Sequence, residues 1–122
     1  MNKPTLRKNE IADQYLNFLD QHIDDVIIGN ELEFFSIKHI ASILAISHTH
    51  FTDTIKKALG KHPCFFYDEK IIAKAKEMLA EKDMLPATVV KKLTYDPSNF
   101  SKFFKKWTGE TPGMYKLHFH QA

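Results

Sequence analysis

Cysteine, glycine and long apolar runs are scarce in this chain of 122 residues, which has one Cys and four Gly. A lone Cys64 cannot form an internal disulfide, so we expect it to be a small packed residue. No apolar run approaches the ~20 residues of a membrane span, and the N-terminus lacks the apolar stretch of a signal peptide. The composition therefore predicts a soluble, cytoplasmic protein with no membrane partner.

The chain also lacks the groupings that catalysis or metal binding requires. It has no Gly-rich phosphate loop, no Ser/His/Asp grouping and no carboxylate pair of defined spacing. His48 and His50 are two residues apart and would not share a helix face, and His118 and His120 lie near the C-terminus. We therefore expect no enzyme activity, no metal site and no cofactor.

Charge is unevenly distributed along the chain. Residues 1–36 carry three Lys/Arg and seven Asp/Glu, a balance of −4, whereas residues 37–122 carry fourteen and eight, a balance of +6. We therefore expect a polyanionic partner to bind residues 37–122. An ordinary solvated, lysine-rich surface would give the same count, so charge alone leaves both interpretations open.

One pattern occurs twice, 49 residues apart. Residues 47–63 read SHTHFTDTIKKALGKHP and residues 96–112 read DPSNFSKFFKKWTGETP. A repeat of this length is a supersecondary unit, and each copy has the pattern of a short helix, a tight turn and a second helix. The sequence therefore predicts a duplicated helix-turn-helix. The identical pairs are Phe51 and Phe100, Lys56 and Lys105, Lys57 and Lys106, Gly60 and Gly109, and Pro63 and Pro112.

Periodicity and capping residues predict an all-α protein of seven helices, with two helix-turn-helix subdomains joined by a linker helix. We expect three stretches: 1–62 with an N-terminal helix and the first lobe, 63–82 with the linker helix, and 83–122 with the second lobe. Ser47 and Asp96 are the expected N-caps of the two second helices. The expected helices cover residues 9–27, 37–44, 47–60, 64–80, 86–93, 96–109 and a short stretch from Thr111-Pro112.

Each second helix should have one buried and one outward face. Phe51, Phe100, Phe103, Phe104 and Trp107 are expected in the core. On the other face, small hydroxyls and Asn allow close approach to base edges, and Lys can donate to guanine. Lysines further along each helix would meet phosphates, as would protonated histidines. The base-reading candidates are Thr49, Thr52, Asp53, Ser98, Asn99, Ser101 and Lys102; the phosphate candidates are His48, His50, Lys56, Lys57, Lys105 and Lys106.

Two alternatives remain at this point. A Lys-Lys pair late in a helix also complements the helix dipole, with no ligand involved. Asp53 either accepts a hydrogen bond from a cytosine amino group or repels phosphate and weakens the first lobe.

The linker helix sets the expected reach. About 17 residues at ~1.5 Å each span ~25 Å. With the width of the lobes, the two second helices would lie roughly one DNA turn, ~34 Å, apart. One chain would then reach two successive major grooves and bind DNA as a monomer.

The second copy, from Ser98 to Pro112 and then Tyr115, resembles the signature of the AraC/XylS type of bacterial transcription regulator, and the likeness covers about residues 37–116. The resemblance implies two helix-turn-helix lobes whose recognition helices enter adjacent major grooves, with the base-reading candidates at the positions above. Double-stranded DNA is then the expected partner and RNA polymerase a further candidate. The chain has no room for a sensor domain, so it resembles the short members of the family, and a fragment of a longer member is the equal alternative.

Three positions depart from the family pattern. Thr94-Tyr95 stands where Gly-Phe is usual, Ile71 replaces an Arg in the linker helix, and Asp53 stands where Arg is frequent. These changes bear on the affinity of the first lobe more than on the fold.

Two rival functions are carried alongside DNA binding. One is a protein-interaction module that binds through the acidic first helix or an exposed Phe34-Phe35. The other is a regulator with a small-molecule pocket between the lobes, although no convergent polar groups in the sequence point to one.

Overall fold

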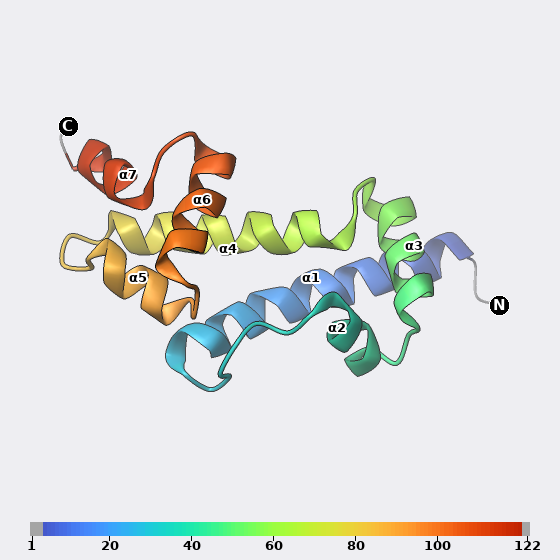
Figure 1. Cartoon of the computed structure of the whole chain (residues 1–122). Coiled ribbons are helices and arrows are strands. Elements are labelled where there is room, and N and C mark those ends of the chain that lie inside the picture. The colour runs from blue at the N-terminus through green and yellow to red at the C-terminus, as the bar shows by residue number, and fades with distance from the viewer. Residues whose placement is uncertain (1–3, 121–122) are drawn as a thin grey trace. The chain divides into compact units, whose positions relative to one another are not determined.

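The computed structural model describes residues 4–120, with side chains from Arg7 onward, and these residues form seven α-helices and no strand. The predicted all-α, seven-helix organisation is confirmed, although the first helix begins at Pro4 instead of Asn9. Figure 1 shows the helices in chain order. They are α1 (Pro4–Ile28), α2 (Ile37–Ile43), α3 (His48–Leu59), α4 (Pro63–Ala80), α5 (Pro86–Lys92), α6 (Pro97–Thr108) and α7 (Pro112–Phe119).

Helices α3 and α6, the second helix of each copy of the repeat, begin and end at the residues that the sequence predicts. The Ser47 side chain accepts a hydrogen bond from the His50 N–H at 3.2 Å, and the Asp96 carboxylate accepts one from the Asn99 N–H at 3.1 Å. Gly60 and Gly109 close the helices with φ values of 83° and 86°. Because this left-handed backbone is unfavourable for residues with a Cβ, glycine fixes the end of each helix.

The turn inside each helix-turn-helix also needs a left-handed residue, but neither copy has glycine there. Ala45 has φ 61° and Thr94 has φ 60°. A β-branched residue such as Thr rarely adopts this conformation, which costs about 1–2 kcal/mol. The unusual Thr94 of the sequence is therefore a locally strained residue, and its hydroxyl donates to the adjacent Leu93 carbonyl at 2.6 Å.

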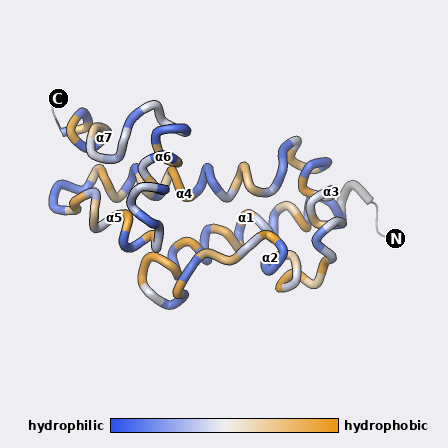
Figure 2. Tube along the Cα trace, viewed as in Figure 1, coloured by the Kyte–Doolittle hydropathy of each residue, from blue (hydrophilic) through white to orange (hydrophobic). Residues whose placement is uncertain are grey.

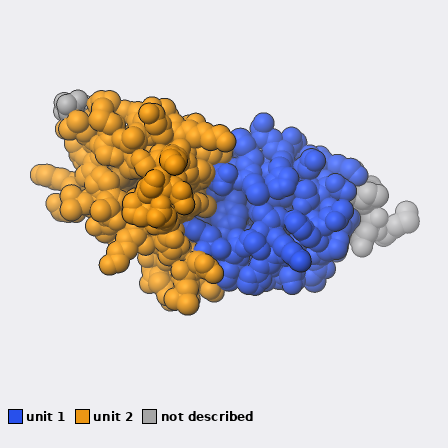
Figure 3. All heavy atoms as spheres, in the orientation of Figure 1, with its two compact units in different colours: residues 1–23, 34–70 blue, residues 24–33, 71–122 orange. Residues whose placement is uncertain are grey.

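The chain divides into two compact units (Figure 3). Unit 1 consists of residues 1–23 and 34–70, and unit 2 consists of residues 24–33 and 71–122. Unit 1 holds α2, α3 and the first parts of α1 and α4, whereas unit 2 holds α5, α6, α7 and the remaining parts of α1 and α4. Each unit thus combines one copy of the repeat with pieces of the two long helices.

The core of unit 1 joins α1 to the first copy of the repeat. Tyr15, Ile40, Phe51 and Ile55 are each 0 % exposed. The Tyr15 ring contacts the Phe51 ring edge-on at 5.0 Å, and its hydroxyl donates to the Pro63 carbonyl at 2.8 Å. Burial raises the pKa of Tyr15 well above its ordinary value, so the phenol remains a neutral donor.

An aromatic cluster around His22 completes unit 1. His22 is buried and its Nε2 accepts a hydrogen bond from the Phe35 N–H at 3.0 Å, while the Phe35 ring lies 4.2 Å from the imidazole. The Tyr67 hydroxyl donates to the Phe35 carbonyl at 2.9 Å, and Phe34 contacts both His22 and Tyr67 edge-on. Phe34 and Phe35 are therefore half-buried, and the expectation that they form an exposed docking surface is wrong.

Unit 2 has its own core around α6. Leu79, Leu93, Phe100 and Phe104 are each 0 % exposed. Lys116 of α7 donates to the carbonyls of Leu79 and Glu81 at 3.1 and 2.7 Å, at the C-terminal end of α4. A cation placed there complements the helix dipole and satisfies terminal carbonyls.

Three residues of the expected core are less buried than predicted. Phe103 and Trp107 are half-buried, because they lie at the edge of the face that α6 turns inward. Cys64 is exposed at the start of α4, so the expectation of a packed residue is wrong. Partial desolvation, and then the charge of Asp68, raise the pKa of the Cys64 thiol, which disfavours the reactive thiolate.

Hydrophobic and hydrophilic residues follow one another in short stretches along the long helices (Figure 2). This pattern is typical of helices with one buried face. Within the part of the chain that the structure describes, no helix combines the length and the apolar character that crossing a membrane would require.

Candidate nucleic-acid interface

Helix α3 turns one face into unit 1 and leaves the other to solvent. Phe51, Thr54 and Ile55 are buried. A helix turns 100° per residue, so the positions between them face outward. Of the base-reading candidates on this helix, Thr49 and Asp53 are exposed and Thr52 is half-exposed.

Helix α6 repeats this arrangement in unit 2. Phe100 and Phe104 are buried, and the Asp96 side chain caps the N-terminus of the helix. Ser98, Asn99 and Lys102 are exposed and Ser101 is half-exposed. All seven base-reading candidates thus lie on the outward faces of two equivalent helices.

The phosphate candidates are also at the surface. His48 and His50 lie in the first turn of α3, and the two lysine pairs lie in the last turns of α3 and α6. All six side chains, those of His48, His50, Lys56, Lys57, Lys105 and Lys106, are exposed. No cluster of three metal-ligating side chains occurs among the described residues.

Ion pairing separates the lysines of the chain into two classes. On α4, Lys70 pairs with Asp20 at 2.7 Å, and Lys74 pairs with Asp24 at 3.3 Å and with Glu77 at 3.7 Å. The acidic face of α1 is therefore partly neutralised within each unit. Among residues 7–120, the lysines of α3 and α6 have no carboxylate within ion-pair distance, so their charge is available to a polyanion.

Asp53 and Lys102 occupy the same position in the two copies and carry opposite charges. Asp53 borders a shallow polar hollow of about 270 Å³ together with His48, Thr49, Thr52 and His62. The hollow lies on the outward face of α3, so a ligand approaching this face meets the carboxylate directly. Both interpretations of Asp53, a hydrogen bond from a cytosine amino group and repulsion of phosphate, stay predictions.

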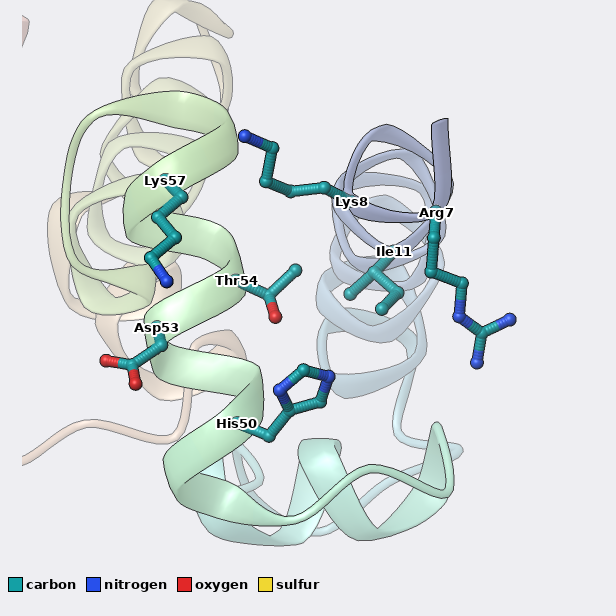
Figure 4. Close-up of a pocket in the computed structure, with 7 residues that line it drawn as sticks. All are labelled: Arg7, Lys8, Ile11, His50, Asp53, Thr54 and Lys57. Carbon is teal, nitrogen blue, oxygen red and sulfur yellow. The ribbon is translucent and has the colours of Figure 1, made fainter. Parts of the chain in front are cut away.

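A second cleft beside α3 was not predicted from the sequence, and the first turns of α1 lie across it from α3 (Figure 4). It has a volume of about 340 Å³. The signal that could have revealed it is the basic pair Arg7-Lys8, which stands before the acidic residues of α1. The lining residues are Arg7, Lys8, Ile11, His50, Asp53, Thr54 and Lys57.

Comparison with known proteins gives a consistent result. A family model described as a helix-turn-helix domain matches residues 40–118. An uncharacterized HTH-type transcriptional regulator, YtdP of Bacillus subtilis (strain 168), is 35% identical over 115 residues. That match covers 92% of this chain but only 15% of the relative, so the chain corresponds to a small part of a much longer protein.

Two solved structures share the fold. The C-terminal domain of AraT, a response regulator from Geobacillus stearothermophilus, superimposes with a TM-score of 0.76 at 21% identity, covering 88% of this chain and 84% of that one. A DNA-binding transcriptional dual regulator from Escherichia coli K-12 superimposes with a TM-score of 0.75 at 16% identity, covering 92% and 94%. These likenesses confirm the architecture of the chain.

Proposed function

The chain belongs to the AraC-type helix-turn-helix family of DNA-binding transcription regulators, a family of regulators and not of enzymes, and we propose that it inserts α3 and α6 into successive turns of the major groove of double-stranded DNA. The outward faces of these helices then read base edges, and their later turns contact the flanking phosphates. Regulation of transcription would follow from occupancy of such sites.

One observation carries this proposal. Each unit presents the second helix of its repeat with an apolar face buried and a polar face exposed, and the lysines on that face lack an ion-pair partner among residues 7–120. The Lys-Lys pair recurs at the same position in both copies and is followed each time by Gly-x-x-Pro, which supports a role beyond complementing the helix dipole. Lys70 and Lys74 of α4 pair with carboxylates instead, and these two lysines supply a contrast within the same chain.

Specific contacts follow from the chemistry of the exposed groups. The Asn99 amide can donate to and accept from the major-groove edge of adenine, and Lys102 can donate to guanine O6 and N7. Thr49, Ser98 and Ser101 have short side chains, so the helix backbone can approach the bases closely. The Lys56-Lys57 and Lys105-Lys106 pairs supply affinity that does not depend on sequence.

A chain with two recognition helices needs no second copy to cover two half-sites. We therefore expect one monomer on each DNA site. Contact with RNA polymerase stays a prediction of the family resemblance.

Selection of bound duplexes from a random pool tests the proposal. We expect two short preferred sequences whose centres are about 10 base pairs apart, one helical turn. If ~5 phosphates are neutralised, log affinity should fall against log salt with a slope of about −4 to −5. Equal binding of all duplexes, or a single short site, would contradict the double insertion.

The interaction-module alternative loses one of its two suggested surfaces, the exposed Phe34-Phe35, whereas the acidic face of α1 is only partly neutralised. Phe34 and Phe35 pack around His22, and the acidic face of α1 pairs with α4 through Asp20 and Asp24. A gel-shift assay against a pull-down with bacterial lysate separates the two functions. Only a protein that captures a partner and shifts no duplex would favour the alternative.

A further inference from the structure

We propose that the cleft between the first turns of α1 and α3 in unit 1 binds a phosphate of the DNA backbone beside the groove that α3 enters. This inference rests on the proposed function and extends the DNA interface to a helix that lies outside the helix-turn-helix. Lys8 and Lys57 would be the two principal ligands of the phosphate.

The cleft brings cationic groups together from two helices (Figure 4). Lys8 extends its amine from α1 toward α3, and Lys57, which also lines the cleft, runs along α3 toward Asp53. The His50 ring points into the space between the two helices, whereas the Arg7 guanidinium points away from α3. A phosphate in the cleft would therefore meet Lys8 from α1 and would draw Lys57 from α3, with Arg7 contributing charge at longer range.

The positive charge in the cleft is only partly offset within the protein. Among residues 7–120, neither Lys8 nor Lys57 has a carboxylate within ion-pair distance. Asp53 is the one acidic residue that lines the cleft, against Arg7, Lys8 and Lys57. The lining thus has an excess of two positive charges with His50 neutral, which favours a phosphate anion.

The shape and position of the cleft favour the DNA backbone over a free anion. At about 340 Å³ the cleft is much larger than one phosphate, and Ile11 and the Thr54 side chain contribute apolar surface to it. A deoxyribose next to the phosphate would cover that surface. Asp53 lines both this cleft and the hollow with Thr49 and Thr52, so the cleft adjoins the face that we assign to base reading. One continuous polyanion can occupy both.

The first test measures the affinity of the full chain for its selected duplex at several salt concentrations. Lys8→Ala should weaken binding by roughly three- to tenfold for all sequences alike, and should reduce the salt slope by about 1. Lys8→Arg should retain the slope. Lys82→Ala, which removes one exposed charge from the turn after α4, is the control for net charge and should change the slope less.

The second test locates the phosphate. Single phosphates of the selected duplex are replaced in turn by neutral methylphosphonates, and each duplex is titrated with the wild-type chain and with Lys8→Ala. At one backbone position, the replacement should weaken wild-type binding and leave Lys8→Ala binding nearly unchanged, because that contact is already lost. Additive effects at every position would overturn the assignment.

A titration with inorganic phosphate tests whether the cleft binds a free anion instead of the DNA backbone. Amide shifts of α1 and α3 that saturate at low-millimolar phosphate, together with unchanged DNA binding by Lys8→Ala, would assign the cleft to a free anion and overturn the proposal. If the wild-type chain selects no duplex, the proposed function fails, and this inference fails with it. If it selects a duplex and Lys8→Ala keeps both affinity and slope, the cleft proposal alone fails.

Discussion

Helices α3 and α6 have the same length, the same Gly C-cap and the same terminal lysine pair, yet they differ in charge. Within its 12 residues, α3 carries Lys56, Lys57 and Asp53, a net charge of +1, whereas α6 carries Lys102, Lys105 and Lys106, a net charge of +3. The Gly C-cap and the terminal lysine pair are thus repeated in both helices, whereas the outward position with Asp53 in α3 has Lys102 in α6. If DNA binds the outward faces of both helices, α6 attracts the phosphates more strongly than α3. In unit 1, Lys8 of α1 adds a positive charge beside α3.

The two units also differ in the polar contacts that join the long helices to their neighbours. In unit 1, buried tyrosine hydroxyls bind backbone carbonyls: Tyr15 binds Pro63 and Tyr67 binds Phe35. In unit 2, the Lys116 ammonium donates to the carbonyls of Leu79, in the last turn of α4, and of Glu81, just after it. The two units are therefore stabilised by unrelated polar contacts, so a substitution can weaken the contacts of one unit and leave those of the other intact.

The largest expected effect concerns the aromatic residue that both copies share. Phe51→Ala and Phe100→Ala should each lower the free energy of unfolding by about 3–5 kcal/mol, because each removes a side chain that is 0 % exposed. Urea denaturation followed by circular dichroism measures the loss. Phe103→Ala is the control and should cost clearly less, since that ring is half-buried. Equal costs for Phe100 and Phe103 would contradict the burial described here.

The next effect concerns the position at which the copies differ. Lys102→Ala should cost about 1–3 kcal/mol of binding to the selected duplex and relax sequence preference at one half-site. Asp53→Ala should strengthen binding if the carboxylate repels phosphate, and should weaken binding at one base pair if it accepts from cytosine. Titration against duplexes mutated in each half-site measures both. Equal loss at both half-sites for Lys102→Ala would contradict its assignment to one of them.

A pH effect of similar size should be confined to unit 1. The pKa of Tyr15 is raised by burial, so above pH ~10 the unfolded chain loses this proton while the folded chain keeps it. The contribution of Tyr15 is therefore complete below pH ~10 and declines by about 1.4 kcal/mol per pH unit as the pH rises further. Tyr15→Phe should remove that part of the slope and cost about 1 kcal/mol at neutral pH, because the Pro63 carbonyl loses its donor.

Urea denaturation of the wild-type chain and of Tyr15→Phe, at neutral pH and at several values above pH ~10, measures this difference. Parallel stability curves for the two chains would show that the Tyr15 hydroxyl is not the group that titrates.

The smallest effect concerns the two turns. Thr94→Gly should stabilise unit 2 by about 0.5–1 kcal/mol, because relief of the left-handed strain exceeds the entropy that glycine adds to the unfolded chain. Ala45→Gly should have the same sign and a smaller size in unit 1, since Ala lacks a β-branch. Thermal unfolding monitored by calorimetry measures both changes. Destabilisation by Thr94→Gly would show that the bond from the Thr94 hydroxyl to Leu93 outweighs the strain.

The features of this fold that sequence predicts well are local ones. Ser47 and Asp96 cap the helices that they precede, and Gly60 and Gly109 end them, because capping depends on residues within one turn. The expected outward positions of α3 and α6 follow in the same way from helical periodicity.

Features that depend on distant neighbours were predicted less well. Phe34 and Phe35 are covered because His22 and Tyr67 lie beside them, and Cys64 is exposed although its residue type favours burial. The cleft at Lys8 depends on the packing of α1 against α3, which no local pattern encodes. Whether the candidate residues contact DNA stays a prediction.

The division of α1 between the units has a consequence for biosynthesis. As the polypeptide leaves the ribosome, unit 1 has all of its residues once residue 70 has emerged, whereas residues 24–33 must wait for residues 71–122. During that interval Val26, which is 2 % exposed in the finished protein, lacks its later-made neighbours. Residues 24–33 belong to unit 2 but lie between the two segments of unit 1 in the sequence. Expressing the chain as two consecutive fragments therefore cannot give two complete units.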